Sequence, residues 1–163
     1  MAVDPLGTGA RLGLLELGNV GKQVAALDEA GKDGGTTATL LVPQTAPFNH
    51  ETVTFTLEPK GSIEYKYRLD RGEVLLYSWK APLPVNYEFH AEPDGAPRGY
   101  AQSYDKSTGT GKAGTLTAPF AGIHGWYWEN TSDQPVTVTL DSAGFYNLAH
   151  EFTAGGVKNK SFP

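Results

Sequence analysis

The chain has 163 residues, enough for one domain with its own core plus an extension. Glycine (20 residues) and proline (11 residues) are abundant and only 19% of residues are charged, which suits an all-β domain with many turns. A formal net charge of −5 argues against binding to a nucleic-acid backbone, and the absence of cysteine excludes disulfides, thiolate zinc sites and cysteine nucleophiles.

Residues 1–30 have the pattern of a membrane-proximal amphipathic helix, with apolar residues mostly three or four positions apart. Gly13, Gly18 and Gly21 weaken such a helix by about 1 kcal/mol each relative to alanine, so it needs a partner surface. It is either a stalk or self-association helix next to a membrane anchor, giving a homo-oligomer, or a helix packed on its own domain. The apolar stripe consists of Leu12, Leu15, Leu17, Val20, Val24 and Leu27.

A linker rich in glycine, threonine and proline follows at residues 31–49. The next residues show the period-two alternation of half-buried strands, first between Val53 and Leu57. Such strands recur about every 8 to 12 residues, which predicts an all-β sandwich or jelly roll of about eight antiparallel strands over residues 50–152. We expect a flexible tail at residues 153–163.

Glycine and proline predict two interruptions within the sandwich. Pro82 and Pro84 should end a central strand that begins at Val74, because proline cannot donate to a strand ladder. Residues 107–114 are expected to form a flexible loop, and they lack the glycine and lysine spacing of a phosphate-binding loop.

The aromatic stretch around Trp126 and Trp128 dominates the predicted core. These tryptophans alternate in one run and a second alternating run begins at Val136, with a turn cluster at residues 130–135 between them. This pattern predicts a β-hairpin.

The same stretch resembles the GOLD-type β-sandwich, the lumenal domain of emp24-like cargo receptors. The resemblance rests on an aromatic strand that ends at Asn130, a turn, and a following strand that leads to the sequence Gly144-Phe145-Tyr146. It implies a sandwich that serves in binding.

A second resemblance covers most of the chain. Residues 3–14 (VDPLGTGARLGL) and 123–128 (IHGWYW) are similar to a family of bacterial transmembrane anchor proteins, in which the first stretch directly follows one membrane helix. The resemblance implies a membrane helix upstream of Met1 in the full-length protein. It also implies an extracytoplasmic, periplasmic sandwich anchored to the inner membrane.

Histidines and carboxylates predict a metal site. His90 shares the polar face of its strand with Glu88 and Glu92, and His124 precedes the aromatic strand. Imidazole and carboxylate are ordinary ligands of zinc, copper and nickel. The hypothesis is a transition-metal site built from His90 and His124 with Glu92 or Glu88. The alternative is that each histidine is a solvated or hydrogen-bonded residue near a strand end.

The aromatic residues offer a second candidate site. Trp126 and Trp128 point to the opposite face from Tyr127, so one set could line a groove for a peptide, a lipid headgroup or a glycan. Tyr104 joins the tryptophans as a candidate ligand contact. The favoured alternative is burial in the core, because large aromatic residues in alternating strands are normally packing residues.

The sequence favours a binding module over an enzyme. Ser103, Asp105 and His124 could be combined into a triad, but no G-x-S-x-G motif marks a nucleophile. We therefore expect a non-catalytic adaptor domain of a membrane-anchored protein, which captures a transition-metal ion. The alternative is a protein-interaction module that uses an aromatic surface and no metal. Nucleic acid is not an expected partner.

Overall fold

A computed structural model describes residues 42–163 of the chain. The helix predicted over residues 1–30 and most of the linker predicted over residues 31–49 therefore lie outside the described residues. Residues 44–163 form one compact unit. Within the described residues, no helix is present that is long and apolar enough to cross a lipid bilayer.

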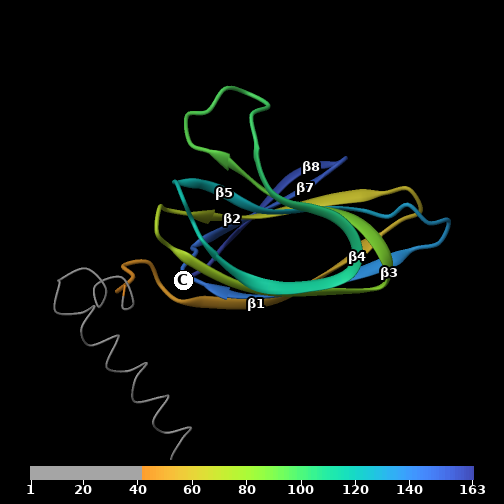
Figure 1. Ribbon diagram of the computed structural model, residues 1–163, viewed down its shortest axis with the longest axis horizontal. Helices are drawn as coiled ribbons and strands as arrows, with labels where there is room; N and C mark the ends of the chain where they lie inside the picture. Colours follow the sequence, from red (N-terminus) through yellow and green to blue (C-terminus); the bar gives the residue numbers. More distant parts are fainter. Residues whose placement is uncertain (1–41) are drawn as a thin grey trace, which may run out of the picture. The chain divides into compact units, whose positions relative to one another are not determined.

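The described chain is an antiparallel sheet of eight strands that curls over on itself (Figure 1). The prediction of an all-β fold with about eight antiparallel strands is confirmed. The strand order is β1-β6-β3-β5-β2-β7-β8, and β4 pairs with β3. The bounds are β1 Asn49–Leu57, β2 Ser62–Leu69, β3 Val74–Pro93, β4 Gln102–Thr117, β5 Gly122–Glu129, β6 Val136–Gly144, β7 Leu148–Thr153 and β8 Gly156–Ser161.

Strand β3 belongs to both halves of the curled sheet. Its first part pairs with β6 up to Lys80, and its second part pairs with β5 from Asn86 onward. The prediction that Pro82 and Pro84 end a strand is wrong, because both lie inside β3. They are tolerated because they fall at the register shift between Lys80 and Val85, where the strand changes partners and needs no ladder donor.

Strands β5 and β6 do not form the predicted hairpin. β5 pairs with β2 and β3, whereas β6 pairs with β1 and β3, so residues 130–135 cross between the two halves of the sheet. Asn130 holds this crossing in place. Its buried side-chain amide donates to the carbonyl oxygens of Leu57, Glu58 and Gln134 at 2.8 to 3.1 Å.

Two stretches expected to be irregular are strands. Residues 107–114 lie within β4, where Gly111 lets the strand follow β3 closely, because a Cβ there would lie 2.7 Å from the carbonyl oxygen of Trp79. Residues 156–161, expected to belong to a flexible tail, form β8 against β7. The turn between β7 and β8 ends at Gly156, which has a φ of 118°, a value that glycine adopts at little cost. Pairing to a neighbouring strand, which composition does not reveal, orders both stretches.

The core lies between the two halves of the curled sheet. Trp79, Trp126 and Trp128 are at most 2% exposed, and the rings of Trp126 and Phe89 are stacked with centroids 4.3 Å apart. Burying rings of this size dominates the energetics of the core. The inner face of each strand is the one that carries these residues, and the outer face is the opposite one.

A hydrogen-bonded polar cluster lies on the inner face, where β1, β2, β6 and β8 meet. The hydroxyl groups of Tyr65 and Tyr67 each donate to Oε1 of Glu51 at 2.8 Å. Lys160 pairs with Oε2 of the same carboxylate at 2.5 Å, and the Glu51 side chain is only 4% exposed. The inner cluster comprises Glu51, Tyr65, Tyr67, Ser142, Tyr146 and Lys160.

Candidate functional site

Four ionisable side chains gather on the outer face of the central strands. Glu64 and Lys66 come from β2, and His90 and Glu92 come from β3. These strands are not neighbours, because β5 lies between them. The side chains meet over Gly125 of β5, which is in register with both Lys66 and His90. We call this set of four side chains the outer cluster.

Gly125 shapes the floor of the outer cluster. A Cβ atom at this position would lie 2.0 Å from the backbone oxygen of Tyr65 and 2.6 Å from the Cα atom of Lys66. Any other residue would therefore push β2 away from β5. The missing side chain also leaves space above the strand, which the long side chains from both sides fill.

Lys66 lies at the centre of the outer cluster and is fully buried. Its ammonium nitrogen lies 2.7 Å from Oε1 of Glu64 and 2.5 Å from Oε1 of Glu92. The ring of Phe152 on β7 lies beneath it, with the nitrogen 5.6 Å from the ring centre. A buried ammonium requires such partners, since an unpaired charge in this environment would be costly.

His90 completes the cluster through Glu64. Nε2 of His90 lies 2.7 Å from Oε1 of Glu64, the same oxygen that contacts Lys66. Burial raises the pKa of Glu64, but the hydrogen bonds from His90 and Lys66 outweigh it and lower the pKa overall. Glu64 is therefore a carboxylate at neutral pH. Ligand atoms of Glu64, His90 and Glu92 lie within 4.8 Å of one another, a spacing that suits a metal ion.

The predicted pairing of His90 with His124 is not found. His124 is fully buried on the inner face, on the other side of the sheet from His90. Tyr104 donates to its Nδ1 at 3.1 Å, and its Nε2 donates to the carbonyl oxygen of Phe120 at 3.1 Å. Burial lowers the pKa of His124, so the ring stays neutral. Both nitrogens are occupied, and His124 cannot share a metal ion with His90.

The other predicted site residues are divided between the two faces. Glu88 lies on the outer face but pairs with Lys106 at 2.9 Å instead of joining His90 and Glu92. Trp126 and Trp128, predicted as ligand contacts, are buried in the core, and Tyr104 packs against Phe89 with ring centroids 5.4 Å apart. These three rings are thus packing residues in this structure, as the alternative interpretation held.

No catalytic triad is assembled from the residues that the sequence offered. His124 is bonded to Tyr104 and Phe120, and Asp105 is bonded to Lys112 at 2.6 Å and to the hydroxyl of Tyr87 at 3.0 Å.

Sequence reasoning missed Glu64 and Lys66. Both lie on the polar face of an alternating strand, where charged residues are normally solvated, so their positions did not indicate a site. The one available signal was Gly125, a glycine inside a strand pattern, which marks close backbone approach. Their partners are 26 residues away in the sequence, and no local pattern connects them.

No family model and no curated protein matches the chain by sequence. Solved structures that are similar in shape include the following three, each at a TM-score below 0.5. A de novo designed double-stranded β-helix shares 14% identity over 56% of this chain and 97% of its own, with a TM-score of 0.35. A mitogen from Yersinia pseudotuberculosis shares 17% identity over 58% of this chain and 84% of its own, with a TM-score of 0.44. PliG, a periplasmic inhibitor of g-type lysozyme from Aeromonas hydrophila, shares 17% identity over 64% of this chain and 91% of its own, with a TM-score of 0.39.

Proposed function

We propose that the chain is a non-catalytic binding module that takes up a divalent transition-metal ion through Glu64, His90 and Glu92. The supporting observation is the convergence of three ligand atoms within 4.8 Å. One imidazole and two carboxylates suit zinc, copper or nickel. Because the ligands come from two strands on either side of β5, the site exists only in the folded chain.

Lys66 is the competitor of the metal within this site. Its ammonium already contacts Glu64 and Glu92, and the formal charges of these three groups sum to −1. An incoming dication has to displace the ammonium or lie beside it, and like charges at such distances repel strongly. Lys66 therefore weakens metal binding, and an uncharged residue of similar length should strengthen it.

Titration calorimetry of the metal-stripped protein with zinc, copper and nickel tests the proposal. We expect one-to-one binding that weakens as the pH falls, because protons compete for the imidazole. His90→Gln should lower the affinity by more than about 100-fold, since even the loss of an outer-shell partner costs about 10- to 100-fold. Lys66→Met should raise it.

His50→Gln is the matched control, because His50 is exposed and lies outside the cluster. It should leave the affinity unchanged, as should His124→Gln in any variant that folds. Equal affinity in the wild-type protein and His90→Gln would remove the metal from the proposed function.

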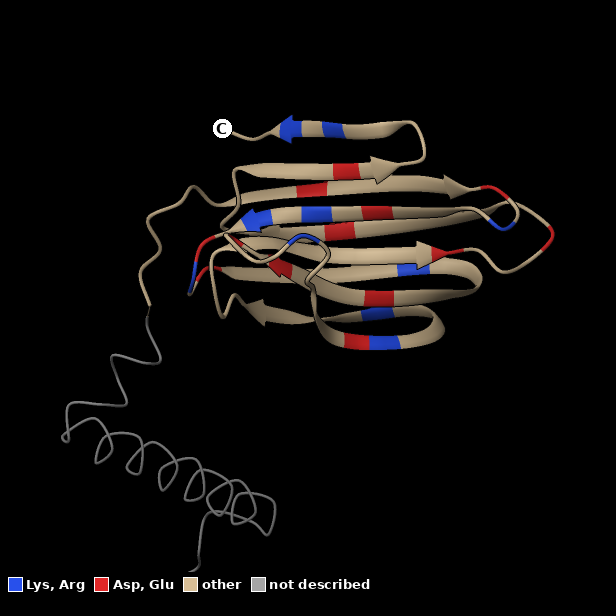
Figure 2. Ribbon diagram, turned by 90° about the horizontal axis from the view of Figure 1, so that it is seen from above, with Lys and Arg blue, Asp and Glu red and all other residues tan. Residues whose placement is uncertain are grey.

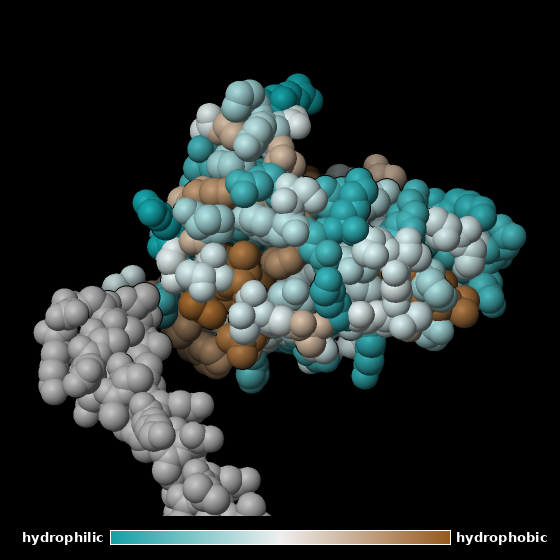
Figure 3. Space-filling view, viewed as in Figure 1, coloured by the Kyte–Doolittle hydropathy of each residue, from teal (hydrophilic) through white to brown (hydrophobic). Residues whose placement is uncertain are grey.

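A protein-binding module without a metal is the second candidate, and an apolar patch favours it. Phe48 is 61% exposed and packs edge-on against Phe145, with ring centroids 5.5 Å apart. Leu76 lies on β3, which β6 separates from β1, and it is 47% exposed. Figure 3 shows hydrophobic side chains gathered where the described chain begins. Exposed patches of this kind often mark interaction surfaces.

Light scattering over a range of concentrations tests this second candidate. Association of the wild-type protein that disappears in the double variant Phe48→Ser, Leu76→Ser would support it. A mass that is the same in both proteins at every concentration would count against a self-association role for the patch.

We also propose that the module lies on the extracytoplasmic side of a membrane, held by a helix that precedes it. The support is the resemblance of residues 3–14 to the stretch that follows the membrane helix in transmembrane anchor proteins. Protease treatment of spheroplasts tests the location. A module that is degraded only after lysis would be cytoplasmic, contrary to the proposal.

A further inference from the structure

Tyr127 is the one aromatic residue of β5 whose side chain is on the outer face. Its neighbours Trp126 and Trp128 point into the core, as alternation along a strand requires. It is in register with Glu64 on β2 and with Glu88 on β3. Its hydroxyl makes no hydrogen bond within the described residues.

The Tyr127 ring separates two hollows in the outer face. The larger, of about 320 Å³, lies over β3, β4 and β5, and the smaller, of about 150 Å³, lies over β2, β5 and β7. The larger volume alone reaches the range of small-molecule sites, about 300 to 1,000 Å³. From β4 to β7 the surface crosses four strand spacings, about 19 Å. An extended ligand of several rings would span both hollows.

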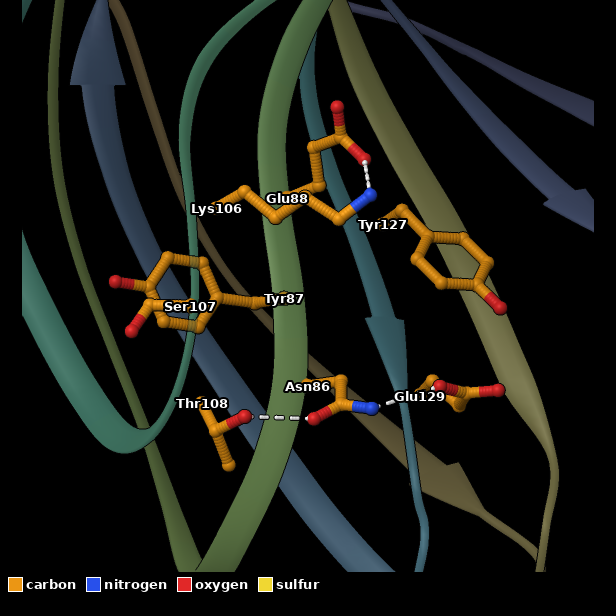
Figure 4. A pocket seen from close by; sticks show the side chains of 8 residues that line it. All are labelled: Asn86, Tyr87, Glu88, Lys106, Ser107, Thr108, Tyr127 and Glu129. Carbon is orange, nitrogen blue, oxygen red and sulfur yellow. Dashed lines mark hydrogen bonds and ion pairs between the residues drawn. The ribbon is translucent and has the colours of Figure 1, made fainter.

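Polar side chains line the larger hollow in a fixed arrangement. Thr108 donates to Asn86 at 2.7 Å, and Asn86 in turn donates to Glu129 at 3.0 Å. Lys106 donates to Glu88 at 2.9 Å. Figure 4 shows the Tyr127 side chain beside these two hydrogen-bonded groups. The amide and the carboxylates can each form further hydrogen bonds. The hollow therefore offers a ligand the donors and acceptor of the amide group and the paired acceptor oxygens of the carboxylates.

The charges around the hollow argue against a strongly charged ligand. Glu88 is neutralised by Lys106, and Glu129 is held by an uncharged amide. Figure 2 shows acidic and basic residues side by side on neighbouring strands, without a broad patch of one sign. A phosphate or a polyanion would meet the carboxylates without a cluster of cations to hold it.

We propose that this surface binds a neutral oligosaccharide, with one sugar ring stacked on Tyr127. An aromatic ring accommodates the apolar face of a pyranose, while amide and carboxylate pairs bind its hydroxyl groups. The ligand lies across the strands, from the larger hollow over Tyr127 into the smaller one. This site adjoins the metal site, because Glu64 lines the smaller hollow, but Tyr127 and the residues that line the larger hollow are not among the metal ligands.

Titration calorimetry with cellohexaose, xylohexaose, maltohexaose and chitohexaose tests the proposal. We expect at least one of them to bind with a Kd of about 1 mM or tighter, and its disaccharide to bind at least about tenfold more weakly. Tyr127→Ala should weaken the binding at least about tenfold, and Glu129→Gln should weaken it less. Tyr127→Phe should retain most of the affinity.

Tyr100→Ala is the matched control, because Tyr100 is 52% exposed and lies on the turn between β3 and β4. It should bind as the wild-type protein does. No binding of any of the four sugars by the folded protein would overturn the proposal, as would binding that survives Tyr127→Ala. The same titrations in a metal chelator and with His90→Gln should give unchanged affinity, so failure here and failure of the metal site are distinguishable.

Discussion

The two polar clusters of this sheet differ in what surrounds their carboxylates. In the inner cluster, Glu51 is 4% exposed and both of its oxygens are bonded to tyrosine hydroxyls or Lys160. In the outer cluster, Lys66 is buried, but the side chains of Glu64 and Glu92 are 23% and 46% exposed. The first cluster is complete without a ligand, whereas the second holds carboxylates that water or a ligand can reach. Burial of the acceptor, more than the presence of charge, separates a structural group from a candidate site.

Alkaline pH should disrupt the inner cluster most strongly. Burial and the nearby Glu51 carboxylate raise the pKa of Tyr65 and Tyr67, and burial raises the pKa of Tyr146 to about 12. In the folded protein the pKa values of these tyrosines exceed the ordinary value near 10, which applies to the unfolded chain. The protonated hydroxyl groups therefore stabilise the fold fully below pH 10, and this contribution to the free energy of unfolding is lost as the pH rises above 10. Each tyrosine contributes a slope of about 1.4 kcal/mol per pH unit, about 4 kcal/mol for three.

Unfolding monitored by near-ultraviolet circular dichroism, together with tyrosinate absorbance, checks this expectation. The two signals should change in one transition between about pH 10 and pH 12. Tyr65→Phe should make the pH dependence of stability shallower by about one third. Ionisation of these tyrosines well before unfolding would show that the inner cluster is open to solvent.

Removal of the inner carboxylate should have the next largest effect. Glu51→Ala leaves the buried Tyr65 hydroxyl without its acceptor and takes away the acceptor of Tyr67. Unsatisfied buried donors cost about 1–3 kcal/mol, so we expect a loss of about 2–4 kcal/mol in the free energy of unfolding. Urea denaturation measures it, with the exposed Glu58→Ala as a control that should stay within about 0.5 kcal/mol of the wild type.

Removal of the central charge of the outer cluster should have the smallest effect. Lys66→Met keeps the length of the side chain, and the two carboxylates it leaves are partly exposed and can be hydrated. We expect a loss of about 1 kcal/mol or less by urea denaturation. A loss as large as that of Glu51→Ala would mean that the outer cluster is as essential to folding as the inner one, and the contrast between them would fail.

Alternation along each strand, which the sequence shows directly, already separates the two faces. His124, Trp126 and Trp128 are two residues apart, so burial of the tryptophans places His124 in the core. By the same reasoning, Phe89 on the inner face places His90 on the outer face. This alternation places His90 and His124 on opposite faces of the sheet, which excludes the predicted metal site that joined them.

Pairing between strands could not be predicted in the same way. Trp128 of β5 and Val136 of β6 are near in sequence, yet their strands lie in different halves of the sheet. A six-residue interval of turn formers fits a hairpin and a crossing equally well, and the buried hydrogen bonds of Asn130 decide between them. The outer cluster depends on this arrangement, since β5 has to lie between β2 and β3 to bring Lys66 to Glu92.

The change of partners along β3 has a consequence for cooperativity. This strand supplies a neighbour for β6 in one half of the sheet and for β5 in the other, and β4 follows it across both. Neither half therefore has a complete set of strands without β3. If β3 opens at one end, the strand paired with it there loses its hydrogen-bond partners, and the same continuous strand also supports the other half. We therefore expect the two halves to unfold together as one thermodynamic unit and not as separate subdomains.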